Sequence, residues 1–164
     1  MKRKFLFYSY IALQSILVLI AIFLFMSSRE KNLDFTCKGN NSYHKKINGD
    51  NINITTSISI NFFSNKEIHT IIHGVLRNNN GVHTINREYD YSYRELDVEK
   101  GRYILKLKSI KKSTNDDDKE GVVSNFLFGG EQTDVNFKIS KINNNIIILG
   151  NVFSPIFGCT ITNN

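Results

Sequence analysis

The sequence predicts an all-β protein in which one N-terminal transmembrane helix precedes an antiparallel, up-and-down β-barrel-like domain of about eight strands. Three observations favour this fold class. Residues 5–26 contain no charged residue, segments of alternating polarity separated by turn residues follow them, and two cysteines lie near the two ends of the β-rich part. At 164 residues, the chain has the length of one ordinary domain.

Residues 5–26 are long enough to span a membrane, because roughly 20 apolar residues in a helix cross a hydrocarbon core of about 30 Å. A cleaved signal peptide is the alternative; its apolar region usually has about 7–15 residues and ends in a small-x-small cleavage site. The run here is longer and ends at Phe25-Met26-Ser27-Ser28-Arg29, which lacks small residues at the required pair of positions. We therefore expect an uncleaved signal anchor.

Positive charge gives the expected orientation. Three basic residues, at positions 2 to 4, lie on the short N-terminal side, whereas the flank after the apolar run has mixed charge. The positive-inside rule then predicts a cytoplasmic tail of residues 1–4, a transmembrane helix of residues 5–26 and a domain of residues 27–164 outside the cytoplasm. In a bacterium, this arrangement is a single-pass inner-membrane protein with a periplasmic domain.

Cys37 and Cys159 are expected to form a disulfide, because the periplasm is oxidising. Closing a loop of more than 100 residues contributes about 5 kcal/mol in the chain-entropy model. Two buried free thiols are the alternative. The sequence has no Cys-x-x-Cys motif for redox catalysis, and one distant cysteine pair does not indicate a metal site. A bonded pair would make the first and last strands neighbours, which favours a closed or nearly closed barrel over an open sheet.

The clearest strand covers residues 51–63. Up to residue 62, its even-numbered residues are Ile, Thr or Phe and its odd-numbered residues are Asn, Ser or Thr. This period of two predicts one buried and one exposed face. A second strand is predicted at residues 67–77, and Asn78-Asn79-Asn80-Gly81 then forms a turn, since Asn-Gly readily adopts positive φ.

The other strands are predicted from shorter alternations and from the turn residues between them. Gly101 precedes one strand, Gly129-Gly130 ends an apolar run at residues 122–128 that is a further candidate strand, and Pro155 breaks the run before the last strand. With a short first strand, the predicted set covers residues 33–38, 51–63, 67–77, 82–94, 102–110, 133–142, 146–153 and 156–162.

One strand face carries a row of aromatic residues. Arg87, Tyr89, Tyr91 and Tyr93 alternate on the same face of the predicted strand at residues 82–94. Tyrosine joins a large apolar body to a hydroxyl, so such rows occur at interfaces, and these four residues are candidates for a partner or ligand surface. The alternative is ordinary packing of a half-buried sheet face.

His69, His73 and His83 are candidates for pH sensing, since histidine titrates near pH 6.5. The alternative is that they are surface histidines on an exposed face. Four residues along a strand place His69 and His73 about 13 Å apart, which is too far for one metal ion. No metal site is expected.

Asp116-Asp117-Asp118 lies in a polar segment, residues 113–121, and lacks the alternating ligands of an EF-hand calcium loop. We expect a solvated loop there. No Gly-x-Ser-x-Gly, Walker, Rossmann or His-Glu-x-x-His motif is present. The formal net charge is +6, but beyond the N-terminal basic residues it is not concentrated in one block. The sequence therefore predicts a protein that is not an enzyme, has no cofactor and makes no direct contact with nucleic acid.

The layout of the whole chain resembles a known family. Its features are a basic Met-Lys-Arg-Lys start, one anchor, Cys37 soon after it, Cys159 near the end, an all-β part between them and the row Arg87-x-Tyr89-x-Tyr91-x-Tyr93. In these features the chain is similar to FidL-like membrane proteins. It also resembles ToxS-like accessory partners of ToxR-type membrane transcription regulators, including the fimbrial-operon kind.

The resemblance implies an accessory that pairs in the periplasm with a regulator carrying a winged-helix DNA-binding domain in the cytoplasm. It would stabilise the regulator or modulate its signalling, and so control virulence or fimbrial genes indirectly. The resemblance also implies a lipocalin-like barrel, which some pairs build jointly and which binds apolar small molecules. Two alternatives stay open: a periplasmic sensor of a small molecule or of pH that acts without a regulator, and a fimbrial assembly component.

Overall fold

The chain divides into two units, residues 1–31 and residues 32–164. The computed structural model describes residues 13–23, 33–47, 50–118, 121, 123, 134–151 and 153–162.

In the first unit, residues 13–23 form a helix whose side chains are exposed all around it. Within the described part of the chain, no helix has both the length and the apolar character needed to cross a membrane. The predicted tail at residues 1–4 and the two ends of the predicted span, residues 5–12 and 24–26, lie outside the described residues.

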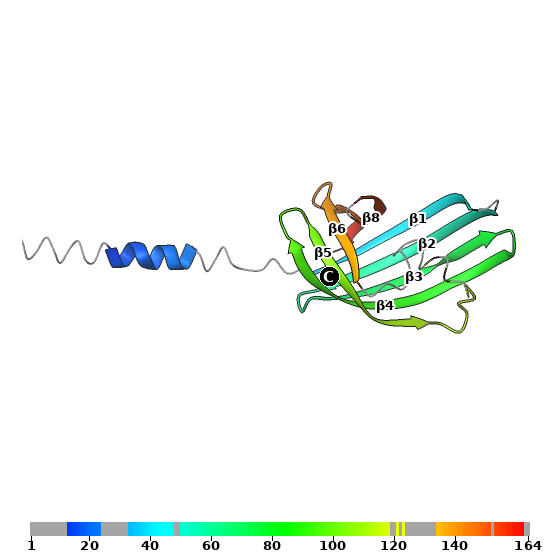
Figure 1. Cartoon of the computed structure of the whole chain (residues 1–164), viewed down its shortest axis with the longest axis horizontal. Helices are drawn as coiled ribbons and strands as arrows, with labels where there is room; N and C mark the ends of the chain where they lie inside the picture. The colour runs from blue at the N-terminus through cyan, green and yellow to red at the C-terminus, as the bar shows by residue number, and fades with distance from the viewer. Residues whose placement is uncertain are drawn as a thin grey trace, which may run out of the picture. The chain divides into compact units, whose positions relative to one another are not determined.

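The second unit is a closed antiparallel barrel whose eight strands follow one another around the wall in chain order (Figure 1). The last strand pairs with the first. The all-β, up-and-down barrel predicted from the alternating segments is therefore confirmed. The strands are β1 (Phe35–Ile47), β2 (Asp50–Phe63), β3 (Glu67–Asn78), β4 (Gly81–Asp97), β5 (Arg102–Lys112), β6 (Asp134–Lys141), β7 (Ile146–Gly150) and β8 (Pro155–Thr162).

Because all pairs are antiparallel, the odd-numbered strands begin and the even-numbered strands end at one end of the barrel. The chain enters β1 there, so we name it the entry end; the opposite end, where β1 ends, is the far end. Strands β1 to β4 have 12 to 17 residues, whereas β6 to β8 have 5 to 8.

The short strands close only part of the wall. β6 pairs with β5 only over Arg102–Lys106, and β8 pairs with β1 only over Thr36–Lys38. Both ladders lie toward the entry end, so the wall has its full height over β1 to β4 and a reduced height over β6 to β8, as the long and short arrows of Figure 1 show.

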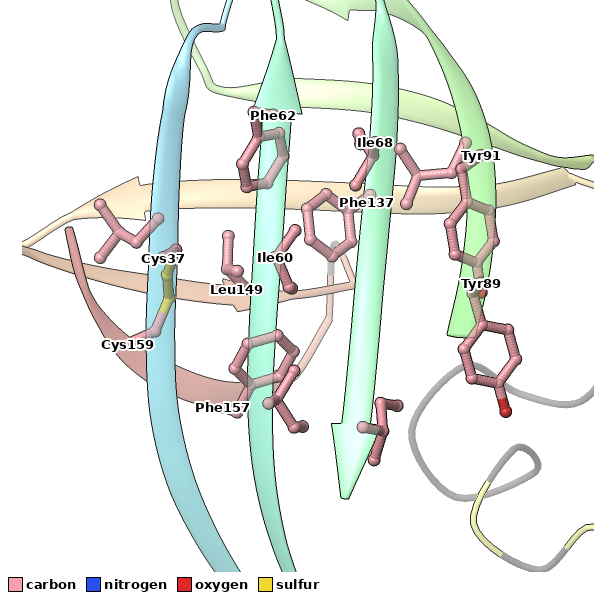
Figure 2. Packing of buried hydrophobic residues seen from close by; sticks show 14 of the residues in the cluster. Cys37, Ile60, Phe62, Ile68, Tyr89, Tyr91, Phe137, Leu149, Phe157 and Cys159 are labelled. Carbon is pink, nitrogen blue, oxygen red and sulfur yellow. A yellow bond between two sulfur atoms is a disulfide. The ribbon is translucent and has the colours of Figure 1, made fainter. Parts of the chain in front are cut away.

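Alternation along each strand builds the core. The even-numbered residues of β2 and β3 and the odd-numbered residues of β4 point into the barrel, as the period of two predicted for β2. Figure 2 shows these side chains meeting those of the short strands inside the wall. The buried apolar residues include Ile54, Ile58, Ile60, Phe62, Ile68, Ile72, Leu76, Ile85, Leu105, Phe137, Ile147, Leu149 and Phe157.

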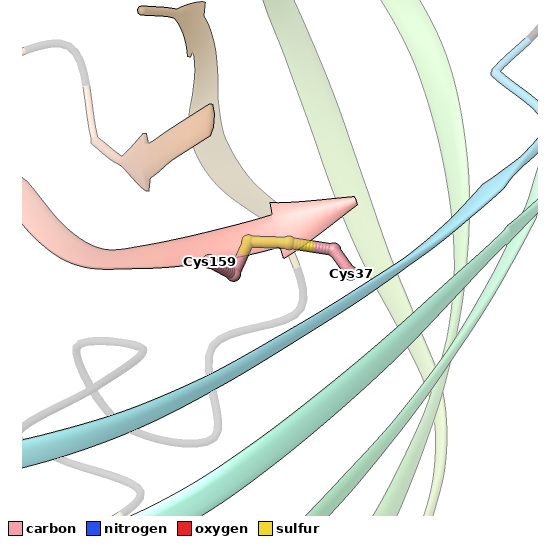
Figure 3. The surroundings of a disulfide bond; sticks show 2 residues. All are labelled: Cys37 and Cys159. Atoms are coloured by element: carbon pink, nitrogen blue, oxygen red, sulfur yellow. A yellow bond between two sulfur atoms is a disulfide. The ribbon is translucent and has the colours of Figure 1, made fainter. Parts of the chain in front are cut away.

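Cys37 and Cys159 are joined by a disulfide between β1 and β8, with their Cα atoms 5.6 Å apart (Figure 3). This is the pairing predicted from the sequence. Both residues are buried members of the core. The bond sits beside the short β1–β8 ladder, so it holds the wall together where the strands pair least.

The largest differences from the predicted strand bounds are in the first strand and in the strand expected at residues 146–153. The first strand was expected to end at residue 38 but continues to Ile47, because its polar second half pairs with β2 along its whole length. The strand expected at residues 146–153 ends at Gly150, since the side chain of Asn151 accepts the amides of Phe153 and Ser154 in a turn. The candidate strand at residues 122–128 lies outside the described residues except for Val123, which is fully buried and not in a strand.

Candidate functional site

A buried arginine with two carboxylates lies inside the barrel. Arg87 is on the inner face of β4 and is 1% exposed. Its Nε donates to Asp116 Oδ2 at 2.6 Å, and its Nη2 donates to Asp116 Oδ1 at 2.7 Å and to Asp118 Oδ2 at 3.0 Å. Nη2 also donates to the carbonyl oxygen of Asp118 at 2.6 Å. We name Arg87, Asp116 and Asp118 the Arg87 cluster.

The two aspartates reach Arg87 because the segment after β5 continues along the edge of β4. The β4–β5 ladder ends at the pair Arg87–Lys112. Beyond it, the Ser113 amide donates to the Asn86 carbonyl at 3.0 Å, and the Asp117 amide donates to the Thr84 carbonyl at 3.2 Å. Residues 113–118 therefore replace a strand at this edge and turn alternate side chains inward.

Carboxylates of the same segment complete the edge of β4. The amide of Asn86 donates to Asp116 Oδ2 at 2.9 Å, and the amide of Thr84 donates to Asp117 Oδ1 at 2.5 Å. The aspartates thus bind backbone donors as well as the guanidinium, which is how buried polar groups are satisfied.

The ionic state of the cluster follows from opposing effects. Burial alone would lower the pKa of Arg87, but hydrogen bonds with Asp116 and Tyr89 outweigh burial and raise that pKa above its usual value. Burial likewise pushes the pKa of Asp116 upward, but hydrogen bonds from Arg87 and from the Asn86 amide hold it below its usual value. Arg87 and Asp116 are therefore both charged at neutral pH.

The expectation of a solvated loop at Asp116-Asp117-Asp118 is wrong for two of the three residues. The side chains of Asp116 and Asp118 are buried, and only Asp117 is exposed. The reason is Arg87, because a guanidinium inside an apolar barrel requires buried counter-charges. The signal was present in the sequence: an arginine on an inward strand position, followed by a run of three aspartates.

The tyrosine row shares one face, as predicted, but that face is the interior. Tyr89, Tyr91 and Tyr93 are 2–4% exposed, and Figure 2 shows Tyr89 and Tyr91 in line along β4. The Tyr89 and Tyr91 rings stack at 6.1 Å, and burial raises the pKa of Tyr91. The row Arg87, Tyr89, Tyr91 and Tyr93 is therefore not an exposed partner surface, and its side chains pack in the core.

Two further polar residues face the interior and were not identified as candidate site residues from the sequence. Asn41 of β1 and Thr56 of β2 are cross-strand neighbours. Asn41 Nδ2 and Thr56 Oγ1 are buried and have no hydrogen-bond partner among the described residues. The alternation of β2 predicts that Thr56 faces inward, whereas no pattern marks Asn41, because the polar half of β1 shows no alternation. Together they offer a donor and a hydroxyl to a polar group that enters the barrel.

The three predicted histidines lie apart: His69 and His73 are on the outer face of β3, whereas His83 is on β4 near the far end, at a position that pairs with the buried Leu76. His69 Nδ1 is 2.7 Å from Asp90 Oδ1, and Ser109 Oγ donates to Asp90 Oδ2 at 2.6 Å. These hydrogen bonds, from Ser109 first and then from His69, lower the pKa of Asp90. His83 Nδ1 lies 3.9 Å from Asp117 Oδ2.

His73 lines a groove of about 530 Å³ on the outside of β2 to β4. The groove also contains Arg77, Thr55 and Asn86. By the ladder register, His69 lies opposite Asp90, His73 opposite Asn86 and His83 opposite Leu76, so the structure does not bring the three together. Across the described ranges, no three His, Cys, Asp or Glu side chains gather in a way that could hold a metal ion.

The wall also presents two strand edges. Beyond Lys38, the described strands provide no ladder for β1 on the side away from β2, although β1 continues to Ile47. Likewise, β6 pairs with β5 only as far as Lys106, and residues 107–112 continue past it. These edges flank the low part of the wall, and an unpaired edge is a template for another strand.

A family model described as "FidL-like putative membrane protein" matches residues 74–159, which is more than half of the chain. The matched part runs from the second half of β3 into β8 and includes the Arg87 cluster and Cys159. No curated protein matches the chain.

Proposed function

The chain belongs to the FidL-like membrane protein family, as its sequence layout suggested, and from this membership we propose a specific role. The protein is a single-pass inner-membrane accessory whose periplasmic barrel binds a ToxR-like membrane-bound transcription regulator. It stabilises the regulator or modulates its signalling, and so controls virulence or fimbrial genes indirectly. It acts by binding and not as an enzyme.

The partly paired edge of β1 carries this proposal. β8 forms a ladder with only three residues of a strand that is 13 residues long. A strand from a partner can add to such an edge by backbone hydrogen bonds, with side-chain contacts giving specificity. Confining both proteins to one membrane raises their effective concentration, so a modest edge interaction suffices.

The membrane topology is supported by the first 30 residues. Residues 5–26 lack any charge, and the helix at residues 13–23 exposes apolar side chains all around, which is the character of a helix covered by lipid. The basic residues before the apolar run favour a cytoplasmic N-terminus. The buried Cys37–Cys159 disulfide agrees with an oxidising compartment for the barrel.

The test is deletion of the protein followed by measurement of the regulator and of its target genes. We expect the regulator to be degraded or inactive, and unchanged regulator level and target transcription would contradict the proposal. Photo-crosslinking locates the contact: a crosslinker at Ser42, on the outer face of β1 near its edge, should capture the regulator. The matched control is Ser57 of β2, which is exposed but whose strand is paired on both sides.

A second candidate function is binding of an apolar small molecule without a regulator. Asn41 Nδ2 and Thr56 Oγ1 favour it, because they are buried without a hydrogen-bond partner among the described residues and a polar group on a ligand would satisfy them. The same crosslinking separates the possibilities. Capture of a regulator supports the accessory role, and copurification with pilus subunits indicates fimbrial assembly. If neither protein is captured and the purified barrel contains a small molecule, the protein is a sensor.

A further inference from the structure

The entry end of the barrel carries an apolar rim. Most of the exposed large apolar side chains of the described barrel lie on three turns there or at the strand ends beside them, at the β2–β3, β4–β5 and β6–β7 connections. They are 37–62% exposed, although no sequence pattern joins the three turns. We name the entry rim as Phe63, Leu96, Val98, Ile142 and Ile146.

The far end does not repeat this arrangement. Among the described residues toward that end, the large apolar side chains that are exposed are Val82 on the β3–β4 turn and Phe153 on the β7–β8 turn. They are single residues on turns that are not neighbours around the wall. Single exposed apolar residues are ordinary, whereas a group on one face marks an interaction surface.

Two carboxylates near the entry rim are paired with lysines within the barrel. Lys100 Nζ lies 3.0 Å from Asp97 Oδ2, and Lys66 Nζ lies 3.9 Å from Glu95 Oε1. The carboxylates of Asp97 and Glu95 are thus matched by lysines, whereas Glu99, on the same β4–β5 turn, is exposed. Lys141 lies at the end of β6, next to Ile142, and is exposed. A rim of apolar side chains with basic neighbours suits the headgroup region of a bilayer.

We infer that the entry rim rests on the lipid surface, with its apolar side chains in the headgroup region. The inference rests on the proposed anchor. In the chain, β1 follows the apolar segment after a short connection, so an anchor in the bilayer tethers the entry end, and not the far end, to lipid. The rim then fixes how the barrel stands on the membrane, and the unpaired part of β1, beyond Lys38, runs from the lipid side toward the far end.

Tryptophan fluorescence tests this contact, because the chain has no tryptophan and a single introduced one is a clean reporter. The full chain is reconstituted in vesicles of phosphatidylcholine and phosphatidylglycerol, with and without brominated acyl chains, which quench nearby tryptophan. The rim reporters are Leu96→Trp and Ile142→Trp, on two different turns. The matched control is Val82→Trp, at an equally exposed position toward the far end, and Leu19→Trp reports on the anchor.

We expect Leu96→Trp and Ile142→Trp to emit at shorter wavelength and to lose emission intensity in brominated vesicles. Val82→Trp should show neither a blue shift nor quenching. If Leu19→Trp is quenched but the rim variants are quenched no more than Val82→Trp, the inference is wrong and the anchor stands. If Leu19→Trp is also unquenched, the anchor itself is wrong. Crosslinking of a rim position to a protein in cells, with no quenching in vesicles, would make the rim a protein contact and overturn the inference.

Discussion

The entry end and the far end of the barrel close the same wall in different ways. Toward the entry end, β1 and β8 pair and the Cys37–Cys159 disulfide joins them within an apolar core. Toward the far end, β6 to β8 do not reach the full height of the wall. There, residues 113–118 lie along β4, and Asp116 and Asp118 of this segment bind Arg87. One closure is covalent and the other is ionic.

The difference has consequences for how the protein responds to its surroundings. A disulfide persists at any ordinary pH but depends on an oxidising compartment. An ion cluster needs no oxidant, and it can open and reform without a chemical step, but it depends on pH because its carboxylates must stay ionised. The disulfide between β1 and β8 is therefore the permanent closure, and the Arg87 cluster is the reversible closure.

The largest effect is expected from removing the covalent closure. The Cys37→Ala/Cys159→Ala double variant should lose about 5 kcal/mol of unfolding free energy, because the bond closes a loop with a sequence separation of 122. Urea unfolding measures the loss. A reductant should lower the unfolding free energy of the native protein to that of the double variant, and it should not change the unfolding free energy of the double variant. An unfolding midpoint that reduction leaves unchanged would show that β1 and β8 hold without the bond.

Breaking the ionic closure should have the next largest effect. Arg87→Met should cost about 3–5 kcal/mol, because it leaves two buried carboxylates without their counter-charge. The same substitution combined with Asp116→Asn and Asp118→Asn should recover much of the loss, since no buried charge remains. Equal losses for the single and triple variants, measured by urea unfolding, would mean that Arg87 contributes by packing and not by charge.

The pH dependence should distinguish the two closures. The pKa of Asp116 is lower in the folded barrel than in the unfolded chain, whose aspartates titrate near 3.9. Its contribution to stability is therefore complete above that value and is lost as the pH falls through the folded pKa. Amide exchange at Thr84 and Asn86 should rise in this acidic range, while exchange at the β1–β8 ladder should not. A uniform rise at both ends would contradict separate closures.

The entry end was more predictable from the sequence than the far end. The alternation of mainly Ile with Asn and Ser in β2 predicted the strand and the face that it contributes to the core, because packing into a barrel requires a period of two. The cysteine pair gave the neighbouring first and last strands. The alternation in β2 is a local signal, and the cysteine pair is a bond that only two residues of the chain can make.

The far end could not be predicted in the same way, since its order comes from tertiary contacts. The polar second half of β1 is a strand only because β2 pairs with it, and nothing in its own alternation indicates this. Asp116 and Asp118 are buried only because Arg87 is inside the barrel. A pattern analysis treats three consecutive aspartates as solvated, whereas the charge balance of the core requires at least one of them inside.

A glycine at the β1–β8 seam gives a smaller, steric test of the entry end. A methyl group added at Gly39 would lie 2.5 Å from the Gly158 carbonyl oxygen and 3.2 Å from Cys159 Cβ, so Gly39→Ala should cost about 1–3 kcal/mol. Gly158→Ala is the matched control, because its nearest atom would be 3.9 Å away, and it should change stability by no more than about 0.5 kcal/mol. Equal effects in urea unfolding would show that the seam tolerates movement.

The smallest effect is expected on the outer wall, away from both closures. His69→Gln should cost only about 0.2–1 kcal/mol, because the His69–Asp90 pair is partly exposed and screened by solvent. Asp90 has its pKa lowered by Ser109 and His69, so its small contribution should be lost in acid, below about pH 4. His73→Gln, on the same strand face and exposed, should change nothing measurable in urea unfolding. A large, pH-dependent loss of unfolding free energy for His69→Gln, but not for His73→Gln, would instead show that the outer wall also responds to pH. The two closures would then not account for the whole pH dependence of stability.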